Sequence, residues 1–223
     1  MVKILDNITR RDNELAYISD RKVLWQQFRS KFLARSYSKM IPFNIPKAKI
    51  ILKLMGVKCK GKAFFEPPFR VDYGFNIEVG ENFYANSNCI ILDVGKVKIG
   101  DNVMFGPNVS IITAGHPIHP QSRLSRYEYG MPITIGSNCW LGANVTVCPG
   151  ASVGDNCVIG AGSVVTKAMP SNTVCAGNPC RVLREITDDD RKYLYKKQEF
   201  DSEAWQQICK QFNWQVEEDC KAD

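Results

Sequence analysis

A six-residue repeat of aliphatic positions runs through the middle of the chain. It is clearest where Ile99, Phe105 and Ile111 follow one another, and it resumes from Ile135 to Val165 after one long break. From Cys59 to Val165 this six-residue period replaces the helical one. A fixed period indicates a repeat architecture in which each unit buries its apolar side against the next unit.

Three six-residue steps make an 18-residue unit, which we interpret as one turn of a triangular coil. Glycines and asparagines recur at matching places in successive units. Both residues accept left-handed backbone conformations at low steric cost, so each step predicts a short strand and a corner. Five coils stacked as parallel strands about 4.8 Å apart would form a prism roughly 24 Å long. The residues expected to point inward are Phe65, Val71, Val79, Ala85, Ile91, Ile99, Phe105, Ile111, Ile135, Leu141, Val147, Val153, Ile159 and Val165.

Three departures interrupt the repeat. Two joints, Val71 to Val79 and Ile91 to Ile99, are eight residues long, which predicts a two-residue bulge at each coil boundary. The third departure is the segment 113–132, which begins TAGHPIHP. Extending the repeat through it would put Pro117, Arg123 and Tyr129 on the apolar axis of the prism, where they do not fit. We therefore expect an ejected loop, and long loops on rigid scaffolds commonly carry function.

Helical segments are expected on both sides of the prism. Residues 12–38 place Leu24, Phe28 and Phe32 four apart, and residues 47–55 offer Ile50, Ile51 and Leu54 as an apolar face that ends at Gly56. Thr187 and three aspartates after it predict another helix start. A last helix near residues 202–217 aligns Trp205, Ile208, Phe212 and Val216. The predicted domains are a helical segment 1–58, a prism 59–186 and a helical extension 187–223.

The formal net charge is +6, and seven lysines lie between Lys39 and Lys62 with no acidic residue among them. This stretch fits a solvated face, a site for an anionic ligand or a membrane-surface patch. Nothing in it resembles a nucleic-acid-binding module. The charged opening does not resemble a signal peptide, and no segment has the ~20 apolar residues of a membrane span. We expect a cytoplasmic protein with no integral membrane segment.

The nine cysteines do not indicate a disulfide scaffold, because the count is odd and a chain of this length does not need disulfide bonds to stabilise its fold. Cys89, Cys139 and Cys157 each lie two residues before an inward position, where Val103, Val109, Val145 and Ser163 also fall. This placement predicts small, reduced packing residues. It argues against a nucleophilic cysteine.

Both histidines of the chain, His116 and His119, lie in the predicted loop. An imidazole held at the mouth of a rigid prism, between Gly115 and Pro117, is a candidate general base. A zinc hydratase is a rival interpretation, but such sites need three protein ligands and an open position. Two histidines three residues apart do not supply that set, so no metal site is predicted.

The motifs FEPPFRVDYGFNIEVGENFYAN, KIGDNVMFGPNVSI, TAGHPIHP, MPITIGSNCWLGANV, GDNCVIGAGSVVTKAMP and GNPCRVLREI resemble the hexapeptide-repeat O-acetyltransferases of the maltose and galactoside type. The resemblance is dense over residues 65–186. It implies a left-handed parallel β-helix and a homotrimer with active sites between subunits. It also implies that acetyl-CoA enters along the cleft between them, and that His116 removes a proton from a sugar hydroxyl as that oxygen attacks the thioester directly.

The resemblance assigns further residues to the site. The acceptor-binding positions are Asn86, Asp93, Asp72, Asp20 and Arg29. Glu128 is a second candidate catalytic residue because it could orient the His116 ring, although galactoside-type members place that acid at the position of Tyr127. His119 is interpreted as a loop residue. Acetyl-CoA contacts are implied for Trp140, Gly142, Ala143, Ala161, Thr166, Lys167, Arg181 and Arg184, with the Ala143 N–H as an oxyanion donor.

The sequence therefore predicts an acetyl-CoA-dependent O-acetyltransferase that acts on a hydroxyl of a small sugar or glycoside. Acetylation of a polysaccharide precursor or an antibiotic is the alternative within the enzyme class. A non-catalytic hexapeptide scaffold is the alternative outside it. A scaffold would predict loss of the loop histidine or of the basic terminal turn, and both are present.

Overall fold

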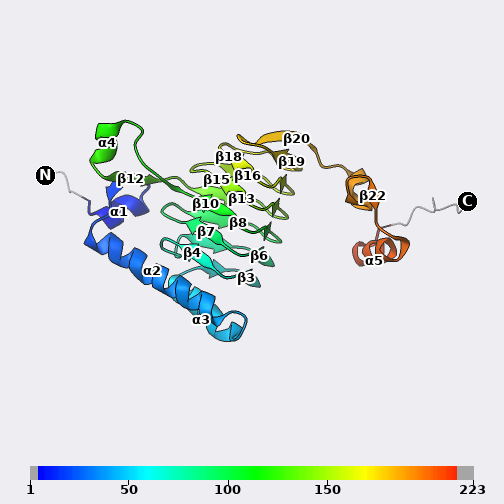
Figure 1. The fold of residues 1–223 in the computed structure, drawn as a ribbon, viewed down its shortest axis with the longest axis horizontal. Coiled ribbons are helices and arrows are strands. Elements are labelled where there is room, and N and C mark those ends of the chain that lie inside the picture. Colours follow the sequence, from blue (N-terminus) through cyan, green and yellow to red (C-terminus); the bar gives the residue numbers. More distant parts are fainter. Residues whose placement is uncertain (1–4, 215–223) are drawn as a thin grey trace, which may run out of the picture. The chain divides into compact units, whose positions relative to one another are not determined.

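The computed structural model describes residues 5–214, and the chain divides into two compact units (Figure 1). The larger unit extends to Glu185 and contains stacked coils of short strands. The smaller unit begins at Ile186.

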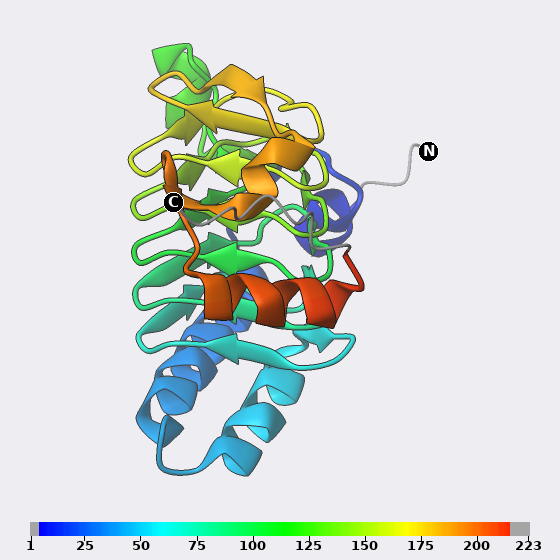
Figure 2. The same cartoon turned by 90° about the vertical axis from the view of Figure 1, so that its right-hand side faces the viewer.

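Three parallel sheets form the faces of a prism in the larger unit (Figures 1 and 2). The first face contains β2 (Lys58–Cys59), β5 (Ile77–Val79), β8 (Val97–Ile99), β13 (Ile133–Ile135) and β16 (Ser152–Val153). The second contains β3 (Ala63–Phe65), β6 (Phe83–Ala85), β9 (Met104–Phe105), β14 (Trp140–Leu141), β17 (Val158–Ile159), β19 (Thr173–Ala176) and the antiparallel β20 (Arg181–Glu185). The third contains β4 (Phe69–Val71), β7 (Cys89–Leu92), β10 (Ser110–Ile112), β15 (Thr146–Val147) and β18 (Val164–Val165). This is a parallel β-helix, as predicted. Its left-handed sense stays a prediction.

The repeated apolar positions stack in register along the axis, which confirms the six-residue repeat. Val79, Ile99 and Ile135 are partners in successive strands of the first face. Phe105 and Ile111 occupy the matching places on the second and third faces. All fourteen predicted inward side chains are at most 2% exposed. Full burial of one aliphatic side chain contributes about 1.5–3 kcal/mol, so this stack is the main source of stability.

Small side chains fill the spaces between these inward residues. Cys89, Cys139 and Cys157 are at most 1% exposed, and their thiols are free. Burial raises the pKa of Cys89 to about 12 and that of Cys139 to about 11. Because the thiolate is the reactive form, these residues are packing groups, as the sequence predicts.

A file of asparagines joins the coils at the corner between the first and second faces. Asn102 and Asn138 have φ values of +56° and +58°, which asparagine tolerates better than most residues. The amide of Asn102 donates to the side-chain oxygen of Asn138 at 3.0 Å, and that of Asn138 donates to Asn156 at 2.9 Å. The same bond continues the file to Asn82 and Asn172. Asparagine thus provides both the turn and the link to the next coil.

All three departures from the repeat lie at one corner, between the third face and the first. The eight-residue joints connect β4 to β5 and β7 to β8. Segment 113–132 leaves after β10 and returns at β13. The insertions therefore stand above one another, and the other two corners keep the regular spacing.

Helices α2 (Arg21–Met40) and α3 (Ile45–Met55) lie side by side at the end of the prism where the coils begin (Figure 2). The helix expected within residues 12–38 is α2, which begins only at Arg21 because Asp20 caps it, and a short α1 (Asn7–Asp12) precedes it. Gly56 ends α3 with φ +88°, as predicted.

The apolar stripe predicted for α2 does not face the core. Leu24 is 50% exposed, and Phe28 and Phe32 are each 63% exposed. The residues that α2 buries are Val23, Ser30, Ala34 and Tyr37.

The physical reason is the surface that α2 covers. The Ser30 hydroxyl donates to the Tyr73 carbonyl, and the Tyr37 hydroxyl donates to the Phe65 carbonyl at 2.9 Å. Tyr73 lies in the irregular joint between β4 and β5, and Phe65 lies in the edge strand β3. Backbone carbonyls at such places need donors when they are covered, and an aliphatic stripe supplies none. The predicted face of α3 is also partly wrong: Ile51 is buried, but Ile50 and Leu54 are 59% and 52% exposed.

The ejected segment forms structure of its own outside the prism. It contains β11 (Ala114–Gly115), α4 (Pro120–Leu124) and β12 (Tyr127–Gly130). β12 pairs with β11 on one side and with β1 (Tyr17–Ile18) on the other, so three antiparallel strands form a small sheet. The ejection of this loop is confirmed.

The smaller unit contains the 3₁₀ helix η1 (Asp188–Lys192), the hairpin β21 (Tyr193–Tyr195) and β22 (Gln198–Glu199), and α5 (Ser202–Phe212). The Thr187 N–H donates to the Asp190 carboxylate at 2.9 Å, which confirms a helix start there. α5 ends earlier than predicted, and Val216 lies outside the described residues. Among the helices of residues 5–214, none has the length and apolar character needed to cross a membrane.

The asparagine file generates a stability prediction. Asn138→Gly removes two side-chain hydrogen bonds but keeps a residue that accepts positive φ, whereas Asn138→Ala also imposes a left-handed backbone cost of ~1–2 kcal/mol. We expect thermal unfolding, followed by circular dichroism, to rank wild type above Asn138→Gly and Asn138→Ala lowest. Equal melting temperatures for the two variants would show that the conformational preference of asparagine is irrelevant here.

Candidate active site

The ejected loop is anchored by a buried threonine at its base. The Thr113 hydroxyl donates to the Leu92 carbonyl at 2.6 Å and accepts from the Gly95 N–H at 2.8 Å. The Met131 N–H donates to the Thr113 carbonyl at 2.9 Å, which closes the loop. A Cβ on Gly130 would lie 2.6 Å from the Gly95 nitrogen, so only glycine permits this close approach. The loop therefore leaves the prism from a fixed point.

Asp93 supports the same corner one coil below. Its carboxylate accepts from the N–H groups of Tyr73 at 2.8 Å, Asp72 at 3.2 Å and Asn76 at 3.3 Å. The side chain is fully buried, and burial raises its pKa to about 7 despite these donors. The structure gives Asp93 a backbone-supporting position, and its predicted contact with an acceptor stays a prediction.

His116 lies at the start of the loop, directly after β11, and is exposed. His119 is the N-cap residue of α4 and is also exposed. No hydrogen bond of the His116 side chain is found among residues 5–214. The imidazole is therefore accessible at the surface of the single chain.

Glu128 is held by the N-terminal segment. Its carboxylate accepts from the Ser19 hydroxyl at 2.8 Å and from the Tyr17 hydroxyl at 3.3 Å. Burial raises the pKa of Tyr17, which keeps its hydroxyl a neutral donor. The predicted role of Glu128 in orienting His116 stays a prediction, whereas its link between β12 and β1 is a feature that the sequence analysis missed.

The other predicted acceptor residues are spread over α2, the joint between β4 and β5, and the corner after β6. Asp72 forms an ion pair with Lys31 at 3.1 Å, and Arg29 donates to the Leu54 carbonyl of α3 at 2.8 Å. Asp20 caps α2, and hydrogen bonds from the Val23 N–H and the Asn7 amide lower its pKa. Asn86 lies between β6 and β7, at the corner of the second and third faces.

Trp140 belongs to a row of outward side chains on the second face. It is 52% exposed and lies in register with Met104 on one side and Val158 on the other. The row continues through Val174 to Arg184. Trp140 and Arg184 are thus three strand spacings apart, roughly 14 Å. An aromatic surface and a cation lie along one line, and Met104, also 52% exposed, is a member of the row that the sequence analysis missed.

The corner between the second and third faces holds Gly142, Ala143 and Ala161. A Cβ on Gly142 would lie 2.7 Å from the Ala161 nitrogen, so glycine is needed for the coils to stack here. Among the hydrogen bonds of the described residues, none uses the Ala143 N–H, whereas the Gly142 N–H is taken by the Ile159 carbonyl. A free N–H at a rigid corner is a suitable oxyanion donor.

The predicted site residues are therefore divided between two corners of one chain. We name them the histidine corner (third to first face: His116, Asp72, Asp93, Thr166 and Lys167) and the alanine corner (second to third face: Asn86, Gly142, Ala143 and Ala161). Thr166 and Lys167 are exposed after β18. Trp140, Arg181 and Arg184 lie on the second face. A single prism does not place the candidate base and the candidate oxyanion donor at the same corner.

Comparison with known proteins identifies the family of this chain. Residues 132–167 match the family model "Hexapeptide repeat of succinyl-transferase". Galactoside O-acetyltransferase of Escherichia coli is 45% identical over 177 residues, which cover 79% of this chain and 87% of the relative. The chain belongs to the family of galactoside and maltose O-acetyltransferases.

Two solved structures of this O-acetyltransferase family have the same fold. A maltose O-acetyltransferase from Clostridium difficile has a TM-score of 0.79 and 45% identity, with 83% of this chain and all of that chain covered. A galactoside acetyltransferase in complex with coenzyme A has a TM-score of 0.84 and 40% identity, with 89% and 100% covered. The protein is an acyltransferase, as predicted.

Within residues 5–214, no group of three His, Cys, Asp or Glu side chains lies close enough together to hold a metal ion. The described chain therefore offers no three-ligand site of the kind that a zinc hydratase needs.

The anchor of the loop can be tested by substitution of Thr113. Thr113→Val keeps the shape but removes the hydroxyl, so the Gly95 N–H and the Leu92 carbonyl each lose a buried partner, at about 1–3 kcal/mol for each group. We expect a lower melting temperature and faster proteolysis within residues 113–132. Thr113→Ser keeps the hydroxyl and is the matched control. An anchor role is excluded if the valine variant is as stable as the serine variant.

Proposed function

We propose that the protein is an acetyl-CoA-dependent O-acetyltransferase that acetylates a hydroxyl group of a sugar or glycoside, with His116 as general base. The observation that carries this proposal is the exposed imidazole on a loop whose base is fixed by Thr113. Exposure gives a substrate access to the base, and the anchor limits the motion that would misplace it.

The use of acetyl-CoA is supported by the relative solved with coenzyme A and by the row on the second face. Trp140 offers an aromatic surface for the pantetheine arm. Arg184, about three strands away, and Arg181 on the same strand offer charge-assisted bonds to phosphate groups. Lys167 offers a further cation at the histidine corner.

The proposed reaction is a direct transfer. The acceptor oxygen attacks the thioester carbonyl carbon, His116 takes the hydroxyl proton, and the thiol of coenzyme A leaves. The free Ala143 N–H stabilises the negative charge that develops on the carbonyl oxygen. An acyl-enzyme on Cys89 or Cys139 is disfavoured because burial raises the pKa of both thiols.

The acceptor assignment is supported by the names of the relatives, which are galactoside and maltose O-acetyltransferases. Among the predicted acceptor contacts, Arg29 is exposed and Asn86 and Asp20 are half-buried, whereas Asp72 is largely buried beside Lys31. Eight free cysteines among the described residues support a reducing location, and we place the enzyme in the cytoplasm.

The division between the two corners supports a homotrimer with shared active sites. The histidine corner of one chain needs the alanine corner and second face of another chain to form a complete site. A closed ring of three identical prisms repeats that contact three times.

The general-base role predicts a specific loss. His116→Ala should lower kcat by about 10²–10⁴-fold because proton removal is lost, while the unfolding curve stays unchanged. His119→Ala is the matched control, since it alters the other exposed histidine of the same loop. Release of free thiol from acetyl-CoA, measured against a panel of sugars and glycosides, provides the assay. Undiminished turnover in His116→Ala would exclude His116 as the general base.

The shared site predicts complementation between two defective chains. His116→Ala and Trp140→Ala chains, each poorly active alone, are coexpressed with different tags, and the particles that carry both tags are purified. A mixed trimer contains one interface where an intact His116 meets an intact Trp140, so about a third of wild-type activity should return. If each site were built from a single chain, mixing would restore nothing.

A further inference from the structure

The basic residues of the protein are concentrated at one end of the prism. Residues 21–65 contain twelve lysines and arginines and no acidic residue. The rest of the chain contains seventeen basic and twenty-three acidic residues. The basic segment forms α2, α3 and the first strands, which lie together where the coils begin (Figures 1 and 2). The chain is therefore strongly polarised although its net charge is moderate.

The solvent side of α3 combines apolar and basic residues. Ile50 and Leu54, one turn apart, are 59% and 52% exposed, and Phe43 just before the helix is 89% exposed. Lys47 and Lys53 lie three residues on either side of Ile50 and are exposed, so they flank the apolar strip. In the described structure, neither lysine has an ion-pair partner.

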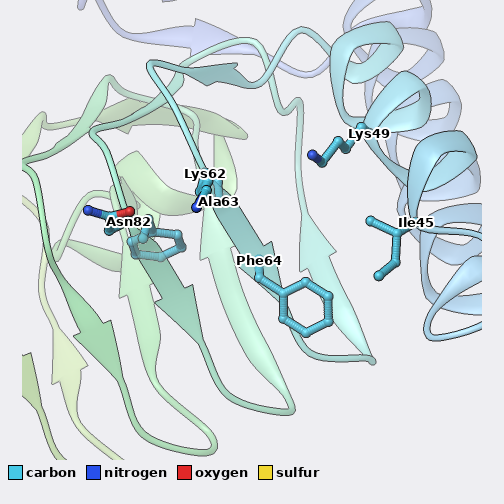
Figure 3. Close-up of a pocket in the computed structure, with 7 residues that line it drawn as sticks. Ile45, Lys49, Lys62, Ala63, Phe64 and Asn82 are labelled. Carbon is cyan, nitrogen blue, oxygen red and sulfur yellow. The ribbon is translucent and has the colours of Figure 1, made fainter.

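A hollow of about 300 Å³ adjoins this face, between α3 and the first coils (Figure 3). Ile45 and Lys49 line it from α3, and Lys62 and Phe64 line it from the prism. Figure 3 shows Lys49 reaching from the helix into the space on the side of Lys62. The hollow therefore offers two ammonium groups beside apolar walls, a combination suited to an amphiphile with an anionic head group.

We propose that the solvent face of α3 docks on an anionic phospholipid membrane surface. Ile50, Leu54 and Phe43 enter the boundary between head groups and acyl chains, and the flanking lysines reach the lipid phosphates. Lys49 and Lys62 receive one phosphate at the hollow. This surface does not overlap the histidine corner or the alanine corner, so the inference goes beyond the proposed function.

The distribution of charged and apolar residues favours an anionic membrane over the other possible ligands of this face. A second copy presenting the same face would bring lysines against lysines with no acid between them, which disfavours a self-contact. A soluble anion would pair with the lysines but would leave the exposed isoleucine, leucine and phenylalanine in water. An anionic bilayer satisfies both groups at once.

The test uses the full-length protein and sedimentation with vesicles of phosphatidylcholine alone or mixed with phosphatidylserine. We expect binding to the mixed vesicles and little to the neutral ones. Lys49→Gln/Lys53→Gln should weaken binding about twenty-five-fold at low salt, from about fivefold per lysine, and salt should reduce this difference. Ile50→Ser/Leu54→Ser should weaken binding at every salt concentration.

Lys196→Gln/Lys197→Gln is the matched control, because it removes the same charge from exposed positions between β21 and β22, outside the basic segment. It should bind vesicles within about twofold of wild type. All variants should keep wild-type acetyl transfer to a soluble acceptor, which verifies folding independently of docking. Three results would overturn the proposal: equal binding to neutral vesicles, an equal loss in the control, or self-association of the protein that explains the pellet without vesicles.

Discussion

The whole structure depends on the return of the chain to the same register after every coil. An inward side chain in a strand becomes an outward one if the register slips by a single residue, so the apolar axis tolerates no error. The stack from Val79 through Ile99 to Ile135 meets this condition on the first face. The same condition selects the residues at the corners. Asparagine occupies positions where the backbone is left-handed, and glycine occupies positions where neighbouring coils are in close contact.

One corner is released from this constraint, and the chain uses buried polar groups to stabilise it. Asp93 accepts from three backbone N–H groups of the joint between β4 and β5. Thr113 accepts from the Gly95 N–H in the joint between β7 and β8. These bonds replace the regular turn that the extra residues prevent. The loop with His116 therefore leaves the prism at its least regular corner, but from a fixed point of attachment.

The fold was predictable from the sequence because inward residues recur at fixed steps and each is decided by local spacing alone. The α2 contacts were not predictable in this way. Helical periodicity correctly indicates a stripe at Leu24, Phe28 and Phe32, but it cannot show which side of the helix meets the prism. That choice depends on the carbonyls of Tyr73 and Phe65, which lie far away in the sequence.

In the candidate site too, features set by local spacing were predictable and contacts between distant residues were not. His116 and the ejected loop follow from the break in the repeat, whereas the partners of Glu128 come from Ser19 and Tyr17, more than a hundred residues earlier. Such long-range pairs leave no periodic signal. The resemblance to the family named Asp93 as an acceptor contact, and the structure shows that its oxygens are engaged by the backbone.

The alignment of all three insertions at one corner has a consequence for how this architecture diversifies. Residues added there change no inward position, because the strands before and after keep their partners in the coils above and below. A segment of any length can thus be exchanged at that corner without repacking the axis. Loops of different length and sequence can therefore occupy this corner while the packing of the apolar axis stays the same.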